Sequence, residues 1–357
     1  MYFYGLGECA ESVLKSIKEM NQLHLLNGVI DSHKKGKWNG IDIVDLCNIN
    51  RKEIIIITVQ NTRYVKQIWQ ILKEQRFENI YFYNFIKPRK DFLVECCTQI
   101  TDWGDSVLPQ VEMHIANHCN LNCKGCTHYS PIFEKNLPDF EQQIKDIKAL
   151  NNKFSHIIRF YLLGGEPLLN QNIGKYITEI KEILPKTDLW IVTNGLLLLS
   201  ISENILDTIS KYNVIVSISE YEPTHKIIDK IKQRLDKHNV SYNIRAYQKK
   251  QTFIKPLSLS ENSIYKKTCI SDGCVNIANG KIARCPSLMY IDKLNSYFNI
   301  NLPNEGIMDL ESCPNGNELI ECLQNEVELC RHCVENKIEW QQCDIKNLKL
   351  DDFVTAL

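Results

Sequence analysis

Three cysteines near the middle of the chain have the spacing of metal ligands. Cys119, Cys123 and Cys126 form the pattern C-x3-C-x2-C, directly after an apolar segment over residues 110–116. A tight loop of this kind can bring three thiolates to one corner of an iron–sulfur cubane. Three ligands leave one of the four irons with an open position, which is typical of a catalytic metal site. The alternatives are a zinc site or three unrelated buried cysteines.

A second motif follows the next predicted strand. The apolar run over residues 157–163 predicts a buried strand, and it ends in the tetrapeptide Gly164-Gly165-Glu166-Pro167. Glycine lets the backbone approach a ligand closely, and a carboxylate suits a bound ammonium group. Taken alone, the tetrapeptide could be an ordinary turn at the end of a strand.

Together, the cysteine triplet and the tetrapeptide resemble the radical S-adenosylmethionine (SAM) superfamily. In that family three cysteines hold a [4Fe-4S] cluster, and SAM chelates the fourth iron through its amine and carboxylate. An electron from the cluster then breaks a carbon–sulfur bond and releases a 5′-deoxyadenosyl radical. The resemblance implies two sets of site residues, the cluster ligands Cys119, Cys123 and Cys126 and the residues that hold the SAM amine, Gly164, Gly165, Glu166 and Pro167.

Weaker matches lie at the ends of later predicted strands, where barrel active sites are found. The resemblance implies that the ribose or carboxylate of SAM contacts Asn194, Ser217 or Ser219, and that the carboxylate pairs with Arg245. Ordinary turns or surface charges are the alternative.

One position departs from the family: many relatives carry an aromatic residue just before the third cysteine, and here that residue is Gly125. Tyr129 or His128 would then have to substitute for it.

Further cysteines with a defined spacing lie toward the end of the chain. Cys269 and Cys285 bracket Gly280 in the pattern C-x10-G-x4-C. Cys330 and Cys333 form a later C-x2-C pair. This arrangement is similar to the opening of the SPASM and Twitch domains of the same superfamily. Because the full SPASM pattern does not follow, the resemblance implies a Twitch-like domain with one auxiliary [4Fe-4S] cluster; a zinc site with the same ligands is the alternative.

The total of 15 cysteines is odd, and the N-terminus has no recognisable export signal, so we expect a cytoplasmic protein without disulfides. Four cysteines are left over: Cys274, Cys313, Cys322 and Cys343. Small buried side chains are the simplest interpretation of most of them, and Cys274 is the exception because it lies within the hairpin near the expected mouth of the barrel. A net charge of −1 indicates neither a nucleic-acid nor an acidic-membrane partner. The most apolar stretch, residues 189–206, is interrupted by polar residues and does not predict a membrane span.

The segments that must position these motifs predict an α/β protein. We expect a small Rossmann-like parallel-sheet domain over residues 1–88, a linker over 89–106, and a partial (β/α)6 TIM-like barrel over 107–255. A loop-rich iron–sulfur domain over residues 256–357 would need bound metal to be stable. In the first domain Gly5-Leu6-Gly7 and Asp31 could form a nucleotide site, although a purely structural fold is equally consistent.

The resemblance implies an enzyme that removes a hydrogen atom from a hydroxyl-bearing carbon of a sugar or cyclitol, either free or linked to a nucleotide. Oxidation would use Glu220 or Tyr221 as the base and the auxiliary cluster as electron acceptor, whereas epimerisation would use Cys274 as a hydrogen donor. A flavodoxin or ferredoxin would supply electrons. The alternatives are a peptide-modifying maturase and a non-catalytic iron–sulfur or nucleotide-binding protein.

Overall fold

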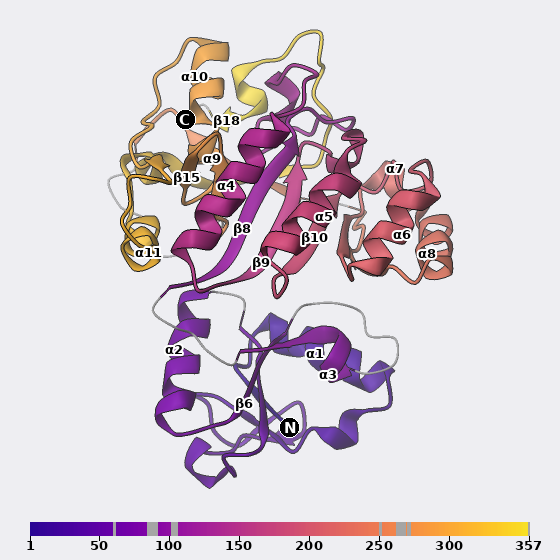
Figure 1. Cartoon of the computed structure of the whole chain (residues 1–357), viewed down its shortest axis with the longest axis vertical. Coiled ribbons are helices and arrows are strands. Elements are labelled where there is room, and N and C mark those ends of the chain that lie inside the picture. The colour runs from indigo at the N-terminus through magenta and orange to yellow at the C-terminus, as the bar shows by residue number, and fades with distance from the viewer. Residues whose placement is uncertain are drawn as a thin grey trace. The chain divides into compact units, whose positions relative to one another are not determined.

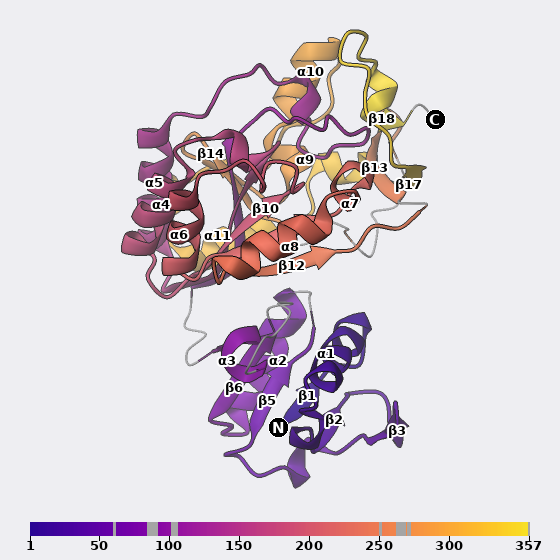
Figure 2. The same ribbon diagram turned by 90° about the vertical axis from the view of Figure 1, so that its right-hand side faces the viewer.

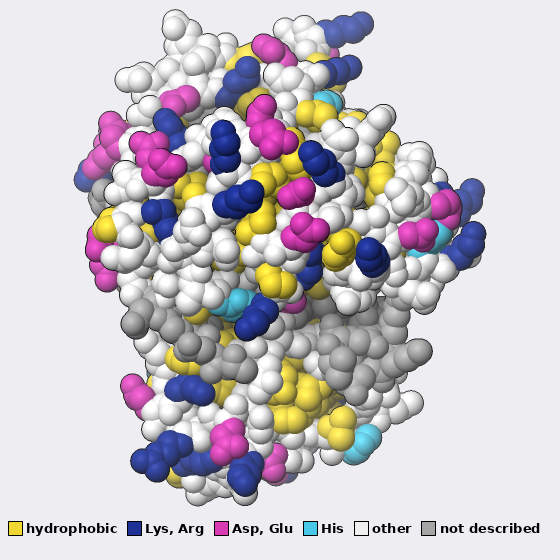
Figure 3. All heavy atoms as spheres, viewed as in Figure 1, with side chains coloured by type: hydrophobic (Ala, Val, Ile, Leu, Met, Phe, Trp, Pro, Cys, Tyr) yellow, Lys and Arg dark blue, Asp and Glu magenta, His cyan; other side chains and the backbone are white. Residues whose placement is uncertain are grey.

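The structure is a computed structural model that describes residues 1–59, 62–83, 92–100, 106–249, 252–261, 269 and 273–355. The chain divides into two compact units, Met1–Gly104 and Asp105–Leu357, and each contains a mostly parallel sheet with helices packed on it (Figure 1). On the face shown in Figure 3, acidic and basic side chains are interspersed, as the net charge of −1 suggests. Within the described ranges, no helix is both long enough and apolar enough to cross a membrane.

The first unit is built on a five-stranded sheet with the order β2-β1-β5-β6-β7. Its strands are β1 (Tyr2–Tyr4), β2 (Gly28–Ile30), β5 (Ile54–Ile57), β6 (Asn79–Tyr83) and β7 (Cys97–Gln99). The first four are parallel, as their continuous apolar sequences predict. The unit also contains α1 (Glu8–Glu19), α2 (Thr62–Glu74), α3 (Phe92–Cys96), the short helices η1 (Leu23–Leu25) and η2 (Leu46–Asn48), and a hairpin of β3 (Lys37–Trp38) and β4 (Ile41–Asp42).

Part of the predicted linker over residues 89–106 belongs to this first unit. Helix α3 and strand β7 occupy residues 92–99, and β7 pairs antiparallel with β6. The side chains of Phe92, Cys96 and Ile100 are buried. The prediction of a linker is corrected for these residues, because their apolar side chains complete the core of the first unit.

The second unit contains an eight-stranded sheet with the order β12-β11-β10-β9-β8-β14-β15-β16. Five parallel strands match the predicted barrel strands: β8 (Val107–Ala116), β9 (His156–Gly164), β10 (Asp188–Thr193), β11 (Ile215–Ser219) and β12 (Ser241–Arg245). The helices between them are α4 (Phe140–Lys153), α5 (Ile173–Ile183), α6 (Glu203–Lys211), α7 (Glu222–His225) and α8 (Ile228–Lys237). Figure 1 shows α4 and α5 lying across β8 and β9. This strand–helix alternation confirms the α/β class, but the sheet stays open within the described residues.

The alternation of side chains along the strands gives this sheet one apolar face and one face that carries polar residues. On β8, Val111, Met113 and Ile115 are buried in a core shared with the helices α4, α5, α6 and α8. Because neighbouring residues of a strand point to opposite faces, Glu112 and His114 point to the other face. The strands therefore carry the polar side chains of the site on the face that the helices do not cover.

The C-terminal segment joins the second unit instead of forming a separate domain. Strand β14 (Asn276–Ala278) pairs in parallel with β8, and it leads into β15 (Lys281–Ala283) and β16 (Met308–Asp309) of the same sheet. A second sheet has the order β17-β13-β18, made of β13 (Thr252–Ser258), β17 (Cys333–Glu339) and β18 (Val354–Thr355). The predicted domain boundary at residue 255 is therefore corrected. Strand β13 crosses it, and the segments before and after it belong to one compact unit (Figure 2).

The remaining helices of the second unit are short. They are α9 (Pro286–Met289), α10 (Ile291–Phe298), α11 (Gly316–Gln324), η3 (Ser130–Ile132), η4 (Pro167–Leu169), η5 (Glu328–His332) and η6 (Leu350–Asp352). Several of them pack into a small core of their own around Leu288, Leu329 and Phe353. This core stabilises the C-terminal segment through apolar contacts in addition to any metal that it binds.

Candidate functional site

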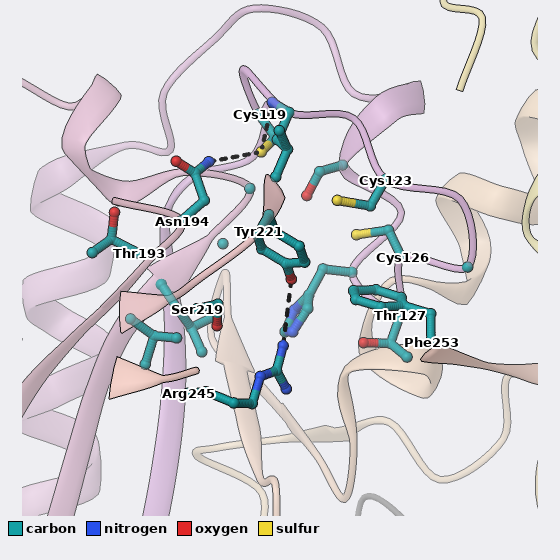
Figure 4. Close-up of a pocket in the computed structure, with 18 of the residues that line it drawn as sticks. Cys119, Cys123, Cys126, Thr127, Thr193, Asn194, Ser219, Tyr221, Arg245 and Phe253 are labelled. Carbon is teal, nitrogen blue, oxygen red and sulfur yellow. Dashed lines mark hydrogen bonds between the residues drawn. The ribbon is translucent and has the colours of Figure 1, made fainter. Parts of the chain in front are cut away.

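The three cysteines of the triplet line one pocket at the carboxyl ends of the parallel strands. The pocket has a volume of about 450 Å³, which is within the usual range for small-molecule sites. Figure 4 shows the sulfur atoms of Cys119, Cys123 and Cys126 on the same side of this pocket. The structure therefore brings the predicted cluster ligands together at the edge of the sheet where α/β enzymes bind their ligands.

The loop that carries the cysteines is fixed on one side by the end of β9. The amide of Gly165 donates to the carbonyl of Ala116 at 2.9 Å, and the amide of Glu166 donates to that of His118 at 3.1 Å. A Cβ atom on Gly164 would lie 2.1 Å from the Ala116 oxygen, and one on Gly165 would lie 2.2 Å from the His118 oxygen. Both positions thus require glycine, because the two backbones touch.

The same loop is fixed on its other side by the C-terminal segment, residues 340–352. The amide of Cys343 donates to the carbonyl of Asn122 at 2.7 Å, and the amide of Gly125 donates to that of Asp352 at 2.7 Å. Gly125 has a φ of +71°, a conformation that glycine adopts without strain. This explains the departure from the family at this position, where an aromatic residue was expected.

Hydrogen bonds also reach the cysteine sulfur atoms. The amide of Leu121 donates to Cys119 Sγ at 3.3 Å, and Trp340 Nε1 donates to Cys123 Sγ at 3.1 Å. Asn194 Nδ2 lies 3.8 Å from Cys119 Sγ. Burial raises the pKa of the Cys119 thiol to about 11, so these donors alone do not ionise it. The thiolate form needs a nearby positive charge, which bound iron would provide.

The donor set is compatible with an iron–sulfur cluster. Among the residues that the structure describes, no group of three His, Cys, Asp or Glu side chains is arranged to hold one metal ion. In a [4Fe-4S] cubane each cysteine binds a different iron, so the sulfur atoms need not converge on one point. The three sulfur atoms lie around an open pocket, and N–H groups donate hydrogen bonds to those of Cys119 and Cys123. This arrangement fits a cluster with one accessible iron.

Polar groups from the later strands form the opposite wall of the pocket. The predicted SAM contacts that line it are Gly164, Gly165, Asn194, Ser219 and Arg245, and Tyr221, Thr193 and Phe253 line it as well. Arg245 Nη2 lies 3.5 Å from the Tyr221 hydroxyl, a contact drawn in Figure 4. Ser219 and Arg245 are paired in register on β11 and β12. The wall thus offers a guanidinium and hydroxyl groups to a carboxylate or a ribose.

The Glu166 side chain is buried among the ends of the strands, and its predicted contact with the SAM amine stays a prediction. The side chain is fully buried and is not among the residues that line the pocket. Its carboxylate accepts hydrogen bonds from Thr193 Oγ1, at 2.7 Å, and from the amides of Leu168 and Asn194. Burial raises its pKa to about 7 despite these donors. Glu166 therefore ties the ends of β9 and β10 together, while Pro167 begins helix η4.

Two further predicted residues lie outside the pocket lining. Ser217 is on β11, two residues before Ser219 and on the same face of the strand. The Glu220 carboxylate contacts His225 Nδ1 at 2.6 Å and accepts a hydrogen bond from the Tyr247 amide at 2.9 Å. The structure therefore gives Glu220 a positioning role at the end of β11 and places its neighbour Tyr221 in the pocket.

A pair of histidines at the pocket was not predicted as a functional pair. His128 lines the pocket, and its Nδ1 lies 2.7 Å from His114 Nε2. His114 Nδ1 lies 3.2 Å from Asn117 Oδ1, and the ring of His114 stacks on Tyr290 at 4.0 Å. Burial lowers the pKa of His128 to about 4, so the pair is uncharged at neutral pH. The alternation of Gln110, Glu112 and His114 with apolar residues along β8 was the signal available in the sequence.

The auxiliary cysteines lie in the second unit. Burial, together with the charges of Cys333 and Cys269, raises the pKa of the Cys285 thiol to about 12. Cys330 belongs to η5, and its sulfur accepts a hydrogen bond from the Val327 amide at 3.5 Å. Several residues around Cys269 lie outside the described ranges. The charges of Cys269 and Cys333 act on Cys285, and a shared metal site of these cysteines stays a prediction.

Cys274 is separated from the pocket that the triplet lines. It lies beside Glu112 and Gln110 of β8, with Gln110 Nε2 3.9 Å from its sulfur. Burial raises the pKa of the Glu112 carboxyl, which accepts a hydrogen bond from Asn276 Nδ2 at 3.0 Å. Cys274 is not among the residues that line the described pocket, so its role as a hydrogen donor stays a prediction.

Replacing Gly165 by alanine should disrupt the cluster loop, because the new Cβ would overlap the His118 carbonyl. We expect G165A to lose most of the EPR signal that responds to SAM after anaerobic reconstitution. Gly174 in α5 has no atom within 4 Å of an added Cβ, so G174A is the matched control and should keep that signal. A G165A protein with the signal of the G174A protein would contradict this account of the loop.

The raised pKa of Glu166 predicts a pH-dependent stability. The unfolded chain loses this proton near pH 4.5 and the folded chain near pH 7, so the free energy of unfolding should fall as the pH rises between these values. The shift corresponds to up to about 3 kcal/mol. Denaturant unfolding of the metal-free chain should show this slope, and the slope of E166Q should be shallower, with the remainder coming from other buried carboxyls such as Glu112. The exposed Glu182 on α5 provides the control, because E182Q should keep the wild-type slope.

Comparisons with known proteins agree with this geometry. A family model described as the radical SAM superfamily matches residues 113–251. A GTP 3′,8-cyclase of Sulfurimonas denitrificans is 29% identical over 135 residues, which are 37% of this chain and 41% of that protein. A GTP 3′,8-cyclase of Campylobacter jejuni strain RM1221 is 30% identical over 100 residues, 27% of this chain and 30% of that protein. The chain thus spans well under half of the length of these relatives.

Two solved structures have weak similarity to the chain. BtrN in complex with AdoMet and 2-DOIA has a TM-score of 0.38 and 14% identity, over 63% of this chain and 92% of that chain. Native anSMEcpe with bound AdoMet has a TM-score of 0.31 and 20% identity, over 38% of this chain and 44% of that chain. From the family match and the pocket around the cysteine triplet, residues 113–251 contain a radical SAM domain, which uses SAM and a [4Fe-4S] cluster.

Proposed function

We propose that this radical SAM enzyme removes a hydrogen atom from a hydroxyl-bearing carbon of a sugar or cyclitol and then oxidises or epimerises it. The observation that carries the proposal is the pocket itself, which combines the cysteine triplet with Arg245, Ser219 and His128. Bound SAM supplies a 5′-deoxyadenosyl radical when the cluster reduces it. Everything else that the reaction needs, namely binding, orientation and exclusion of water, must come from side chains of this chain.

The arrangement of the wall suggests how SAM is oriented. The cysteine sulfurs lie on one side, and the guanidinium of Arg245 and the hydroxyl of Ser219 lie on the wall formed by β11 and β12. A guanidinium favours the SAM carboxylate, and the backbone of Gly164 and Gly165 can approach its amine closely because neither residue has a side chain. Asn194 and Ser217 remain candidates for the ribose. Glu166 would act by holding the ends of the strands in place.

Uncharged polar groups beside this wall favour a hydroxylated substrate. His114 and His128 are neutral and hydrogen bonded to each other, and Tyr290 stacks on His114. Of these three residues His128 lines the pocket, and an uncharged imidazole there suits a sugar hydroxyl better than a charged group, which would prefer an ion pair. The similarity to GTP 3′,8-cyclases supports this choice, because a nucleotide contains a ribose. If the substrate is a nucleotide-linked sugar, the Rossmann-like first unit would have a role in binding the nucleotide. The alternative function is a peptide-modifying maturase.

For an oxidation, the chain must also accept a proton and a second electron. Tyr221 lines the pocket and Glu220 does not, so Tyr221 is the better candidate for the base of the two predicted residues. Burial raises the pKa of Tyr221, so its hydroxyl would accept a proton only as the phenolate, which the Arg245 guanidinium 3.5 Å away would stabilise. The auxiliary cluster held by Cys269, Cys285, Cys330 and Cys333 would accept the electron, and a flavodoxin or ferredoxin would reduce the SAM-binding cluster.

Two sets of cysteine variants test the assignment of the two clusters. The anaerobically reconstituted protein should hold about eight irons, four in each cubane. Replacing Cys119, Cys123 and Cys126 by alanine should abolish 5′-deoxyadenosine formation and halve the iron content. Replacing Cys269, Cys285, Cys330 and Cys333 should also halve the iron but leave SAM cleavage without substrate in place. SAM cleavage in the triplet variant, or zinc in place of the auxiliary iron, would refute the corresponding assignment.

The type of reaction can be identified from the mass of the product. Incubation with SAM and a panel of nucleotide sugars and cyclitols should give a product two hydrogens lighter if the enzyme oxidises its substrate. An epimerase working in heavy water would instead leave one deuterium on carbon. Deuterium incorporation that disappears in C274A, without mass loss in the wild type, would replace oxidation by epimerisation. Conversion of a peptide and of none of these small molecules would favour the maturase.

A further inference from the structure

A tryptophan from the C-terminal segment touches the cluster loop directly. Trp340 Nε1 donates to Cys123 Sγ at 3.1 Å, although the two residues are 217 positions apart in the sequence. Cys123 is the most buried cysteine of the triplet, with 9% of its surface exposed. The indole therefore supplies a directed N–H group to a sulfur atom that water barely reaches.

Neighbouring residues hold the indole in this orientation. Its ring stacks on Tyr221 with centroids 5.3 Å apart and an angle of 30° between the planes. Trp340 follows directly after β17, whose last residues, Ile338 and Glu339, pair with β13. Two positions later, Gln342 Nε2 donates to the carbonyl of Leu121 at 2.9 Å. The orientation of the ring is thus set by the strand before it and the stacked tyrosine beside it, whereas Gln342 contacts the loop backbone and not the ring.

A hydrogen bond to a cluster thiolate has a definite electrostatic effect. When a [4Fe-4S] cluster is reduced, its thiolate sulfurs carry more negative charge, and an N–H donor stabilises that form more than the oxidised one. Hydrogen bonds to the sulfurs are one of the factors that set cluster reduction potentials. The effect is larger at a buried sulfur, where water screens the N–H dipole less.

We propose that the indole N–H of Trp340 raises the reduction potential of the SAM-binding cluster through Cys123. Trp340 is then a positioning residue that makes the cluster easier to reduce by its electron donor. The role goes beyond the proposed function, because it applies whatever the substrate is and rests only on a cluster at the triplet. It also gives the C-terminal segment a part in the first step of the reaction, the entry of an electron.

Replacing Trp340 by phenylalanine removes the N–H donor and keeps an aromatic ring against Tyr221. In potentiometric titrations of the reconstituted holoenzyme followed by EPR, W340F should have a more negative midpoint potential for the cluster whose signal changes when SAM is added. Q342A is the matched control, because Gln342 contacts the same loop from the same segment but donates to a carbonyl oxygen. Its midpoint should stay at the wild-type value.

An unchanged midpoint in W340F, or equal shifts in W340F and Q342A, would overturn the proposal. A second measurement applies if W340F does not hold a cluster. Wild-type protein labelled with ¹⁵N in its tryptophan indoles should show a ¹⁵N hyperfine coupling in the ENDOR spectrum of the reduced, SAM-responsive cluster. The chain has five tryptophans, and Trp340 is the one that donates to a triplet sulfur among the described residues. No ¹⁵N coupling in that spectrum would equally overturn the proposal.

Discussion

The cluster loop between β8 and η3 must present three thiolates in a fixed arrangement although it has almost no regular structure of its own. Backbone hydrogen bonds from outside the loop supply that order: Gly165 and Glu166 donate from the end of β9, and Cys343 bonds from the C-terminal segment. The close approach of two backbones explains glycine at positions 164 and 165, and the positive φ of residue 125 explains glycine there. The rest of the second unit can be understood as the framework that brings these two partners to the loop.

This constraint explains why the C-terminal segment is not an independent domain. Strand β14 extends the main sheet beside β8, and β17 runs from Cys333, an auxiliary cysteine, to the residue before Trp340. One seven-residue strand thus connects the predicted auxiliary site with the tryptophan that contacts Cys123.

Local patterns in the sequence were sufficient to predict the parallel strands β8–β12. They were also sufficient to identify the triplet and Gly164-Gly165 as residues of one site, because strand periodicity and short motifs involve neighbours along the chain. The sequence could not show that residues 92–99 complete the first sheet, or that β13 crosses the predicted boundary at 255, because these depend on long-range pairing. For the same reason the buried position of Glu166 and the contact of Trp340 with Cys123 were not predicted. Two of the partners of Glu166, Thr193 and Asn194, and the partner of Trp340, Cys123, are all distant from them in the sequence.

The central claim is that the triplet holds a cluster whose open iron binds SAM. ENDOR spectroscopy of the reduced holoenzyme with SAM labelled with ¹⁵N at the amine and ¹⁷O at the carboxylate tests it most directly. The account predicts hyperfine couplings from both labels that are absent when Cys119, Cys123 and Cys126 are replaced by alanine. A wild-type cluster whose spectrum does not change on addition of labelled SAM, and shows neither coupling, would contradict it.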